Sequence, residues 1–248
     1  MENQTTPLIE IKHMAKSFGS LEVLKDINLT IHPSEITAII GKSGEGKSVL
    51  LKHIIGLLRP DAGQLIFAGK NLNDYSKAEY GELKDKFSYM FQDSALFDSM
   101  TVYENIALPL VESHRFNKTE IKQRVQQRMQ QLDIAGTDEQ YPGQISGGMK
   151  KRVALARALV TDPEIILFDE PTTGLDPIRK KSVHTMISEY QQKLGFTGVV
   201  VSHEIPDIFS IAQRVVVLNE GEVIFQGSPA ELEQSSDPII LSFIQGEL

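Results

Sequence analysis

The chain has 248 residues, of which 41% are hydrophobic, and its formal net charge is −8 at pH 7. This length and hydrophobic content predict one or two folded domains and exclude wholesale disorder. The acidic balance disfavours nucleic-acid binding, and the absence of cysteine excludes disulfides and zinc–thiolate sites. No run of 18 apolar residues occurs and the first residues do not resemble a secretory signal, so we expect a cytoplasmic globular protein.

Short apolar runs and turn residues alternate in the first third of the chain. Strands are predicted at 8–14 and 27–31 with a loop between them, and then at 35–40, 63–69 and 86–91. The run 48–58 has helical spacing, and a proline- and glycine-containing turn follows it. This order favours a sheet against which helices pack.

The pattern becomes helical from about 93 to 161, with clear amphipathic helices at 118–132 and 147–160. Alternation then returns, with predicted strands at 164–170, 197–202, 214–219 and 222–227 and a helix at 177–194. Strands that alternate with helices predict an α/β fold with a mostly parallel sheet. We interpret the helical middle of the chain as an inserted subdomain.

The stretch GKSGEGKS, from Gly41 to Ser48, fits the phosphate-loop pattern and lies between an apolar strand and an apolar helix. Its glycines allow backbone N–H groups to turn inward, and the helix that begins near Lys47 adds its positive dipole end. Lys47 supplies a charge for the β- and γ-phosphates, and the Ser48 hydroxyl can ligate Mg²⁺. The flanking strand and helix argue against the alternative, which is a glycine-rich surface turn.

Polar side chains follow two of the predicted buried strands. Asp169 and Glu170 end the run IILFDE, and His203 ends VVVSH. Ligands of open α/β sheets bind beyond the carboxyl ends of the strands. Asp169 can hold Mg²⁺ through water, Glu170 can act as a general base on water, and His203 could reach a γ-phosphate. The amide of Gln92, after another strand, could sense Mg²⁺ or the attacking water.

Ser146-Gly147-Gly148 stands directly before a predicted helix. Adjacent glycines cost roughly 1 kcal/mol each in a helix interior, so helix stability does not account for them. Bare backbone at a helix N-terminus can approach an anion closely, and a serine hydroxyl adds a donor. The alternative is an ordinary helix N-cap followed by loose glycines.

Together these motifs follow one another in the order of an ABC-type ATPase, which the chain resembles from KSFGSLEVLKDINLTI to LNEGEVIFQGSPAEL. The resemblance implies a P-loop NTPase with a RecA-like, mostly parallel sheet, an antiparallel β edge and an inserted helical subdomain. We expect a single ABC ATPase domain over 1–248. It would comprise a nucleotide-binding core (1–92 and 162–228), a helical signature subdomain (93–161) and a C-terminal tail (229–248).

The same resemblance implies that two copies form a head-to-tail homodimer. Each ATP would lie between the phosphate loop of one copy and the signature residues Ser146, Gly147, Gly148 and Met149 of the other. Asp176 would contact the opposite copy, and Phe18 would stack on adenine. The implied nucleotide-binding residues are Gly41, Lys42, Ser43, Gly44, Glu45, Gly46, Lys47, Ser48 and Val49; the catalytic ones Glu170, His203 and Gln92; and the Mg²⁺ ligands Ser48, Gln92 and Asp169.

Met149 departs from most of the family, in which Gln follows the two glycines. The serine and glycine donors are kept, so we expect an active site. With FQDSALFDSMTVYENIALPL and SHEIPDIFSIAQRVVVLNEG, the signature resembles the ATPase of Mla/Mce-type phospholipid transporters. This implies membrane permease subunits and an Mce-type lipid-binding protein as partners, and a peripheral location on the cytoplasmic face of the bacterial inner membrane. The segment from Ala95 to Leu110 would dock the permease.

Three alternatives share parts of this pattern. The ATPase of an importer for a small solute, such as an amino acid, would have every catalytic residue. Repair-type ABC proteins carry a long coiled coil between phosphate loop and signature, and translation types usually fuse two ATPase units; neither feature is present. An inactive scaffold is disfavoured because Lys47, Asp169, Glu170 and His203 are all present.

Overall fold

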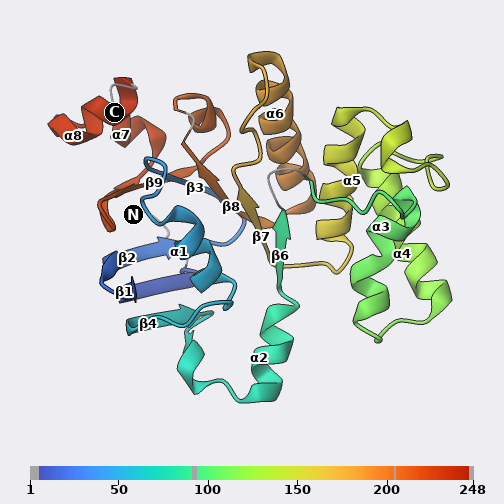
Figure 1. The fold of residues 1–248 in the computed structure, drawn as a ribbon, viewed down its shortest axis with the longest axis horizontal. Helices are drawn as coiled ribbons and strands as arrows, with labels where there is room; N and C mark the ends of the chain where they lie inside the picture. Colours follow the sequence, from blue (N-terminus) through green and yellow to red (C-terminus); the bar gives the residue numbers. More distant parts are fainter. Residues whose placement is uncertain (1–5, 91–93, 204, 246–248) are drawn as a thin grey trace.

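A computed structural model describes residues 6–90, 94–203 and 205–245 (Figure 1). A six-stranded sheet has the order β10 (Glu222–Gly227), β9 (Arg214–Asn219), β3 (Ile36–Ile40), β8 (Thr197–Ser202), β7 (Ile165–Asp169) and β6 (Phe87–Met90). All of these neighbours pair in parallel except β10 with β9. The predicted mostly parallel sheet is therefore confirmed, and its antiparallel edge strand is β10.

Both faces of this sheet are covered, as expected for parallel strands. Alternate residues of β3 belong to different apolar clusters, Ile36, Ala38 and Ile40 to one and Ile39 to the other. The first cluster includes residues of α3 (Val102–Glu112), α4 (Lys118–Gln131), α5 (Gly147–Leu159), α6 (Pro177–Leu194) and α8 (Pro238–Gln245). The second includes residues of α1 (Lys47–Ile54) and of a separate antiparallel sheet. Helices α1 and α5 thus pack on opposite faces of the six-stranded sheet.

The antiparallel sheet has the order β2 (Leu21–Ile31), β1 (Ile9–Phe18), β4 (Ala62–Phe67) and β5 (Lys70–Asn71). The prediction of a loop between 14 and 27 is wrong. The strands β1 and β2 form a hairpin and continue almost to its turn. Register shifts after Ile11, Met14 and Lys16 interrupt the two-residue alternation, which hides the strand in the sequence. The hairpin matters for the site, because Phe18 lies at its tip.

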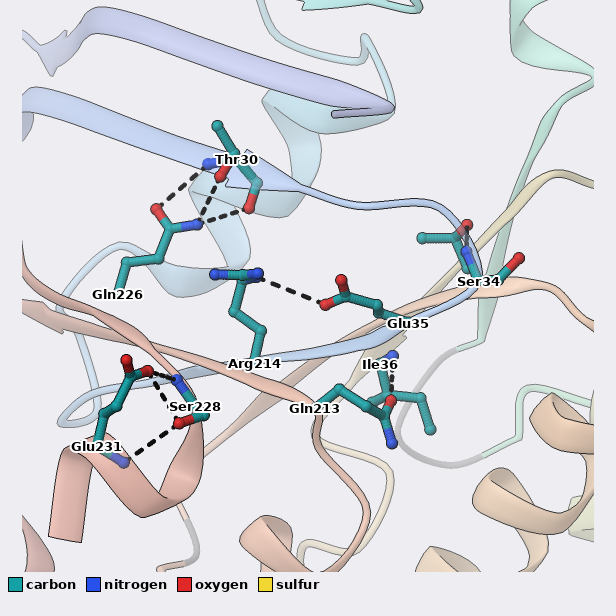
Figure 2. Close-up of polar contacts among 10 residues, drawn as sticks. Thr30, Ser34, Glu35, Ile36, Gln213, Arg214, Gln226, Ser228 and Glu231 are labelled. Carbon is teal, nitrogen blue, oxygen red and sulfur yellow. Dashed lines mark hydrogen bonds and ion pairs between the residues drawn. The ribbon is translucent and has the colours of Figure 1, made fainter. Parts of the chain in front are cut away.

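A glutamine side chain connects the two sheets (Figure 2). The amide of Gln226, on β10, donates to the carbonyl and hydroxyl of Thr30 on β2 at 2.7 and 2.8 Å, and accepts from the Thr30 N–H at 3.3 Å. The side-chain amide of Gln226 thus bonds both backbone groups of Thr30, as a neighbouring strand residue would. Beside it, Arg214 forms an ion pair with Glu35 at 3.5 Å. The hydrogen bonds between Gln226 and Thr30 fix β2 against the core sheet.

Two further helices were not predicted, α2 (Lys77–Lys84) and α7 (Pro229–Glu233). Each begins with a reciprocal capping box, Ser76 with Glu79 and Ser228 with Glu231. Short 3₁₀ turns occupy Leu72–Asp74, Pro142–Gln144 and Asp207–Ser210. In the described part of the chain, none of the helices is long and apolar enough to cross a membrane.

Candidate nucleotide site

The carboxyl ends of three neighbouring strands bring the predicted site residues to one edge of the sheet. Register pairs Ile40 of β3 with Ser202 of β8, and Asp169 of β7 with Val201 of β8. The phosphate loop follows β3, Glu170 follows β7 and His203 follows β8. The structure therefore assembles the phosphate loop, the two carboxylates and the histidine, as expected from their positions after strands.

Positive backbone φ angles shape the phosphate loop. Gly44 and Gly46 have φ of 88° and 92°, in the left-handed region that glycine tolerates. At Gly46 a Cβ would also lie 2.9 Å from Cγ1 of Val23, on β2. At Gly41 a Cβ would lie 2.5 Å from the backbone oxygen of Leu218. The loop therefore requires glycine for both its curvature and its close packing against the two sheets.

Lys47 is folded back into this loop. Its Nζ donates to the carbonyl oxygens of Gly41 and Lys42 at 2.8 and 2.7 Å, and the residue is only 4% exposed. Burial lowers the pKa of Lys47, and the carboxylates of Glu170, Glu45 and Asp169 oppose this effect. A buried ammonium that is held by two neutral carbonyls is well placed to bind an anion.

Asp169 receives donors on both of its carboxylate oxygens. The Ser48 hydroxyl lies 3.1 Å from Oδ1, and the Tyr89 hydroxyl lies 2.5 Å from Oδ2. Burial and the contact with Asp169 raise the pKa of Tyr89, so its hydroxyl keeps its proton at neutral pH. The sequence analysis did not identify Tyr89, because only the register of β6 against β7 brings it to Asp169.

Glu170 is held by two side chains from different elements. Its Oε1 lies 3.1 Å from Nδ1 of His203, and its Oε2 accepts from the hydroxyl of Thr173 at 3.0 Å. Its backbone has φ of 48°, and its N–H donates to the carbonyl of Val201 at 3.0 Å. The strained turn directs the chain away from β7 immediately after Asp169. Glu170 and His203, which were predicted separately as site residues, are therefore in contact with each other.

At the hairpin tip, Phe18 is 48% exposed, so its ring is available to a planar ligand. Nζ of Lys16 lies 5.4 Å from the ring centroid. Asp61 fixes this end of β1, since it accepts from Nζ of Lys16 and from the N–H of Ser17, each at 2.7 Å. Of the remaining loop positions, Lys42 and Ser43 are exposed and Glu45 and Val49 are half-buried.

The signature residues lie apart from the phosphate loop within one chain. They begin α5, which packs on the sheet face opposite to α1. Ser146, Gly148 and Met149 border a hollow of about 590 Å³ together with residues of α6. Ser146 caps α5 by accepting from the N–H of Met149 at 3.2 Å. Asp176 caps α6 by accepting from the N–H of Arg179 at 3.1 Å.

Within residues 6–90, 94–203 and 205–245, no neighbouring atom requires glycine at the two signature positions. A Cβ on Gly147 or on Gly148 would meet no atom within 4 Å, and neither residue has a positive φ. Their bare backbone faces open space at the N-terminus of a 13-residue helix.

Gln92 lies outside the described residues. Ser48 and Asp169 offer a hydroxyl and a carboxylate, which are oxygen ligands of the kind that Mg²⁺ prefers. Among the described residues, no group of three or more His, Cys, Asp or Glu side chains could hold a metal ion. A metal at this edge would bind Ser48 and Asp169 and could take further ligands from a bound phosphate, as Mg²⁺ sites commonly do.

Comparisons with known proteins agree with this geometry. The family model described as "ABC transporter" matches residues 24–173. The chain is 35% identical over 246 residues to the intermembrane phospholipid transport system ATP-binding protein MlaF of Escherichia coli K12, covering 99% of this chain and 91% of MlaF. It is 39% identical over 238 residues to the "probable ribonucleotide transport ATP-binding protein mkl" of Mycobacterium tuberculosis H37Rv, covering 96% of this chain and 66% of that protein.

A solved structure also matches. CbiO1 from Clostridium perfringens, described as part of the ABC transporter complex CbiONQ, superposes with a TM-score of 0.85 and 31% identity, covering 95% of this chain and 94% of that one. Fold and site together define a P-loop nucleotide-binding protein. The chain belongs to the ABC transporter family, and it is an ABC-type ATPase. It spans about two thirds of the length of mkl and nearly all of MlaF.

Proposed function

We propose that this ATPase drives phospholipid transport between the inner and outer bacterial membranes. The observation that supports it best is the alignment with MlaF, whose name states intermembrane phospholipid transport and which matches almost end to end. Met149 after the two signature glycines agrees with the resemblance to Mla/Mce-type ATPases. The mkl proteins, whose name states ribonucleotide transport, extend well beyond the matched part, so their cargo is the weaker guide.

The catalytic unit in this proposal is a head-to-tail dimer. Gly147 and Gly148 are open on the surface of one chain, and their helix packs on the face opposite to the phosphate loop. A second copy would bring Ser146 and these bare N–H groups to the γ-phosphate, at the positive end of α5. Asp176 and the 84% exposed Ile178 would lie in the same interface. Ordinary folding explains neither the open glycines nor the exposed isoleucine.

Lys47 would exchange its two carbonyl partners for the β- and γ-phosphates when ATP binds. Glu170 would accept a proton from the attacking water, and His203, already on its Oε1, would hold that carboxylate and contact the γ-phosphate. Ser48 and Asp169 would hold Mg²⁺, with Gln92 as the further expected ligand; the bound ion supplies charge neutralisation of the phosphates. Phe18 would stack on adenine, and the backbone of 41–49 would surround the phosphates.

Coupling to the membrane would run through the segment that leads into α3. Phe97 is 49% exposed, and the buried Asn105 fixes its loop by accepting from the Phe97 N–H and donating to the carbonyls of Phe97, Met100 and Thr101. Val102 lies within the segment from Ala95 to Leu110 that was expected to dock the permease, but it is fully buried and cannot contact a partner. Arg157 of α5 donates to the carbonyls of Ser94 and Ala95, both at 2.7 Å. Movement of the signature helix would therefore reach this loop directly.

In this proposal, 93–161 moves as a helical subdomain against a core of 1–92 and 162–228. The partners are two permease subunits and an Mce-type lipid-binding protein, and the ATPase sits peripherally on the cytoplasmic face of the inner membrane. These assignments follow from the family resemblance and from the exposed Phe97.

Affinity purification of the tagged chain from detergent-solubilised native membranes tests the proposal, with mass spectrometry of the proteins and lipids that co-purify. A permease with an Mce-type protein and phospholipid is expected. A permease with a soluble solute-binding protein and no lipid, or with bound ribonucleotide, would contradict the lipid assignment. Phe97→Asp should lose the permease, whereas Val111→Asp, at a similarly exposed position of α3, should retain it.

A further inference from the structure

A tyrosine from a neighbouring strand contacts the carboxylate that the proposed metal site depends on. The Tyr89 hydroxyl, on β6, donates to Oδ2 of Asp169 at 2.5 Å. Strand register places Tyr89 opposite Leu167, so its side chain reaches two residues along β7, to the edge where the strand ends. The contact therefore points into the nucleotide site.

Packing alone does not require this hydroxyl. A phenylalanine would fill the same volume, and Asp169 would keep Ser48 on its other oxygen. The hydroxyl adds a second hydrogen bond to the Asp169 carboxylate, on the oxygen that Ser48 does not contact. With donors from two different elements on Oδ1 and Oδ2, the Asp169 carboxylate cannot rotate freely, and its remaining lone pairs keep one orientation. Groups that orient a metal-binding side chain in this way influence metal affinity.

We propose that Tyr89 is a positioning residue for the metal of the ATP site, acting by fixing the orientation of the Asp169 carboxylate. The inference rests on the proposed Mg²⁺-dependent nucleotide site. A Ser48 hydroxyl that ligates Mg²⁺ through its oxygen can still donate its hydrogen to Asp169, so both contacts persist when nucleotide binds. Tyr89 would then fix which lone pairs of the Asp169 carboxylate are left for the metal or its water.

Tyr89→Phe removes only the hydroxyl. Loss of an orienting partner typically costs about 10–100-fold in metal affinity, and a contact through water places this case near tenfold. The readout is nucleotide affinity without turnover, measured by calorimetry with a non-hydrolysable ATP analogue, first in EDTA and then across a Mg²⁺ series. We expect unchanged affinity in EDTA and an about tenfold higher Mg²⁺ concentration at half-saturation.

Tyr190→Phe is the matched control. Tyr190 likewise donates to an aspartate, Asp133, at 3.0 Å, but on α6 and away from the phosphate loop. Its removal should leave both affinities unchanged. Tyr89→Met, which also lacks the donor, should reproduce the shift if Tyr89→Phe folds poorly.

The outcomes distinguish a failure of the proposed Mg²⁺ site from a failure of the role of Tyr89. If the wild-type protein binds the analogue equally well with and without Mg²⁺, the proposed metal site fails, and this inference with it. If Mg²⁺ strengthens binding equally in the wild-type protein and in Tyr89→Phe, the metal site stands and the role of Tyr89 is wrong. Weaker binding in EDTA as well would show a general structural role and would also overturn the inference.

Discussion

His203 and Glu170 are in contact across the ends of two neighbouring parallel strands, with Nδ1 of the imidazole 3.1 Å from Oε1 of the carboxylate. Thr173 holds the second oxygen of the same carboxylate. The proposed general base is thus oriented by the fold itself.

Glu170→Gln is expected to abolish hydrolysis while preserving ATP binding. The amide keeps the shape of the side chain but cannot accept a proton from water, and a general base contributes about 10²–10⁴-fold to rate. Phosphate release and calorimetric ATP affinity measure the two effects. Rapid hydrolysis by the variant would show that another group is the base.

Lys47→Ala is expected to weaken ATP binding by about 10–100-fold, because a hydrogen bond to a charged group contributes about 1.5–3 kcal/mol. Lys52→Ala is the control, since Lys52 is an exposed lysine of the same helix, α1. Calorimetry with ATP measures both. Equal affinities of Lys47→Ala and the wild-type protein would exclude the phosphate-loop role.

Gly148→Ala should make the isolated chain more stable and the enzyme less active. A methyl group there meets no atom within 4 Å, and alanine stabilises a helix by roughly 0.5–1 kcal/mol relative to glycine. In the dimer the same methyl group would stand between the backbone and the γ-phosphate. Urea unfolding and ATPase rates measure the two effects.

Gly143→Ala provides the matched control, because Gly143 also has open space around its Cβ position and no positive φ. Gly143 precedes the signature, so the Gly143→Ala variant should keep the ATPase activity of the wild-type protein. If Gly148→Ala retains full activity as well, the signature glycines are not required by a nucleotide.

The lowered pKa of Glu79 predicts that the free energy of unfolding depends on pH. Its contacts with Lys70 and with the Ser76 N–H lower its pKa to about 2, below the ordinary value of 4.5. Because the folded-state pKa is depressed, this contribution is complete above about pH 4.5 and is lost as the pH falls towards 2. Glu79→Gln should therefore flatten the acid side of the stability profile, as measured by urea unfolding from pH 6 to pH 2. Glu82→Gln, an exposed position of the same helix, should not.

Most of the fold and the fold family could be predicted from the sequence. The strand 197–202 and the helix 177–194 were predicted with the bounds that the structure gives them. The strand is a short continuous apolar run, and the helix carries apolar residues at helical spacing. The phosphate loop and Asp169-Glu170 were recognisable because their chemistry requires fixed residue types at fixed spacings. The carboxyl ends of parallel strands then bring them together.

Long-range contacts could not be predicted in the same way. Helix α2 buries only Leu83, so it has no apolar stripe that a periodicity analysis could detect. Arg157 contacts carbonyls more than 60 residues earlier in the chain, and Tyr89 reaches Asp169 across 80 residues. Both contacts depend on strand register and helix packing, which no local pattern contains.

The central claim is that the ATP site is completed by a second copy, and the mass of the complex with ATP tests it most directly. Light scattering after size-exclusion chromatography should give Glu170→Gln the mass of one chain, 27.6 kDa, without nucleotide, and twice that mass with Mg-ATP. Adding Ser146→Arg to this variant should keep ATP bound but return the mass to that of one chain. A monomer at saturating ATP, or an ATP-induced dimer that persists with Ser146→Arg, would contradict the account.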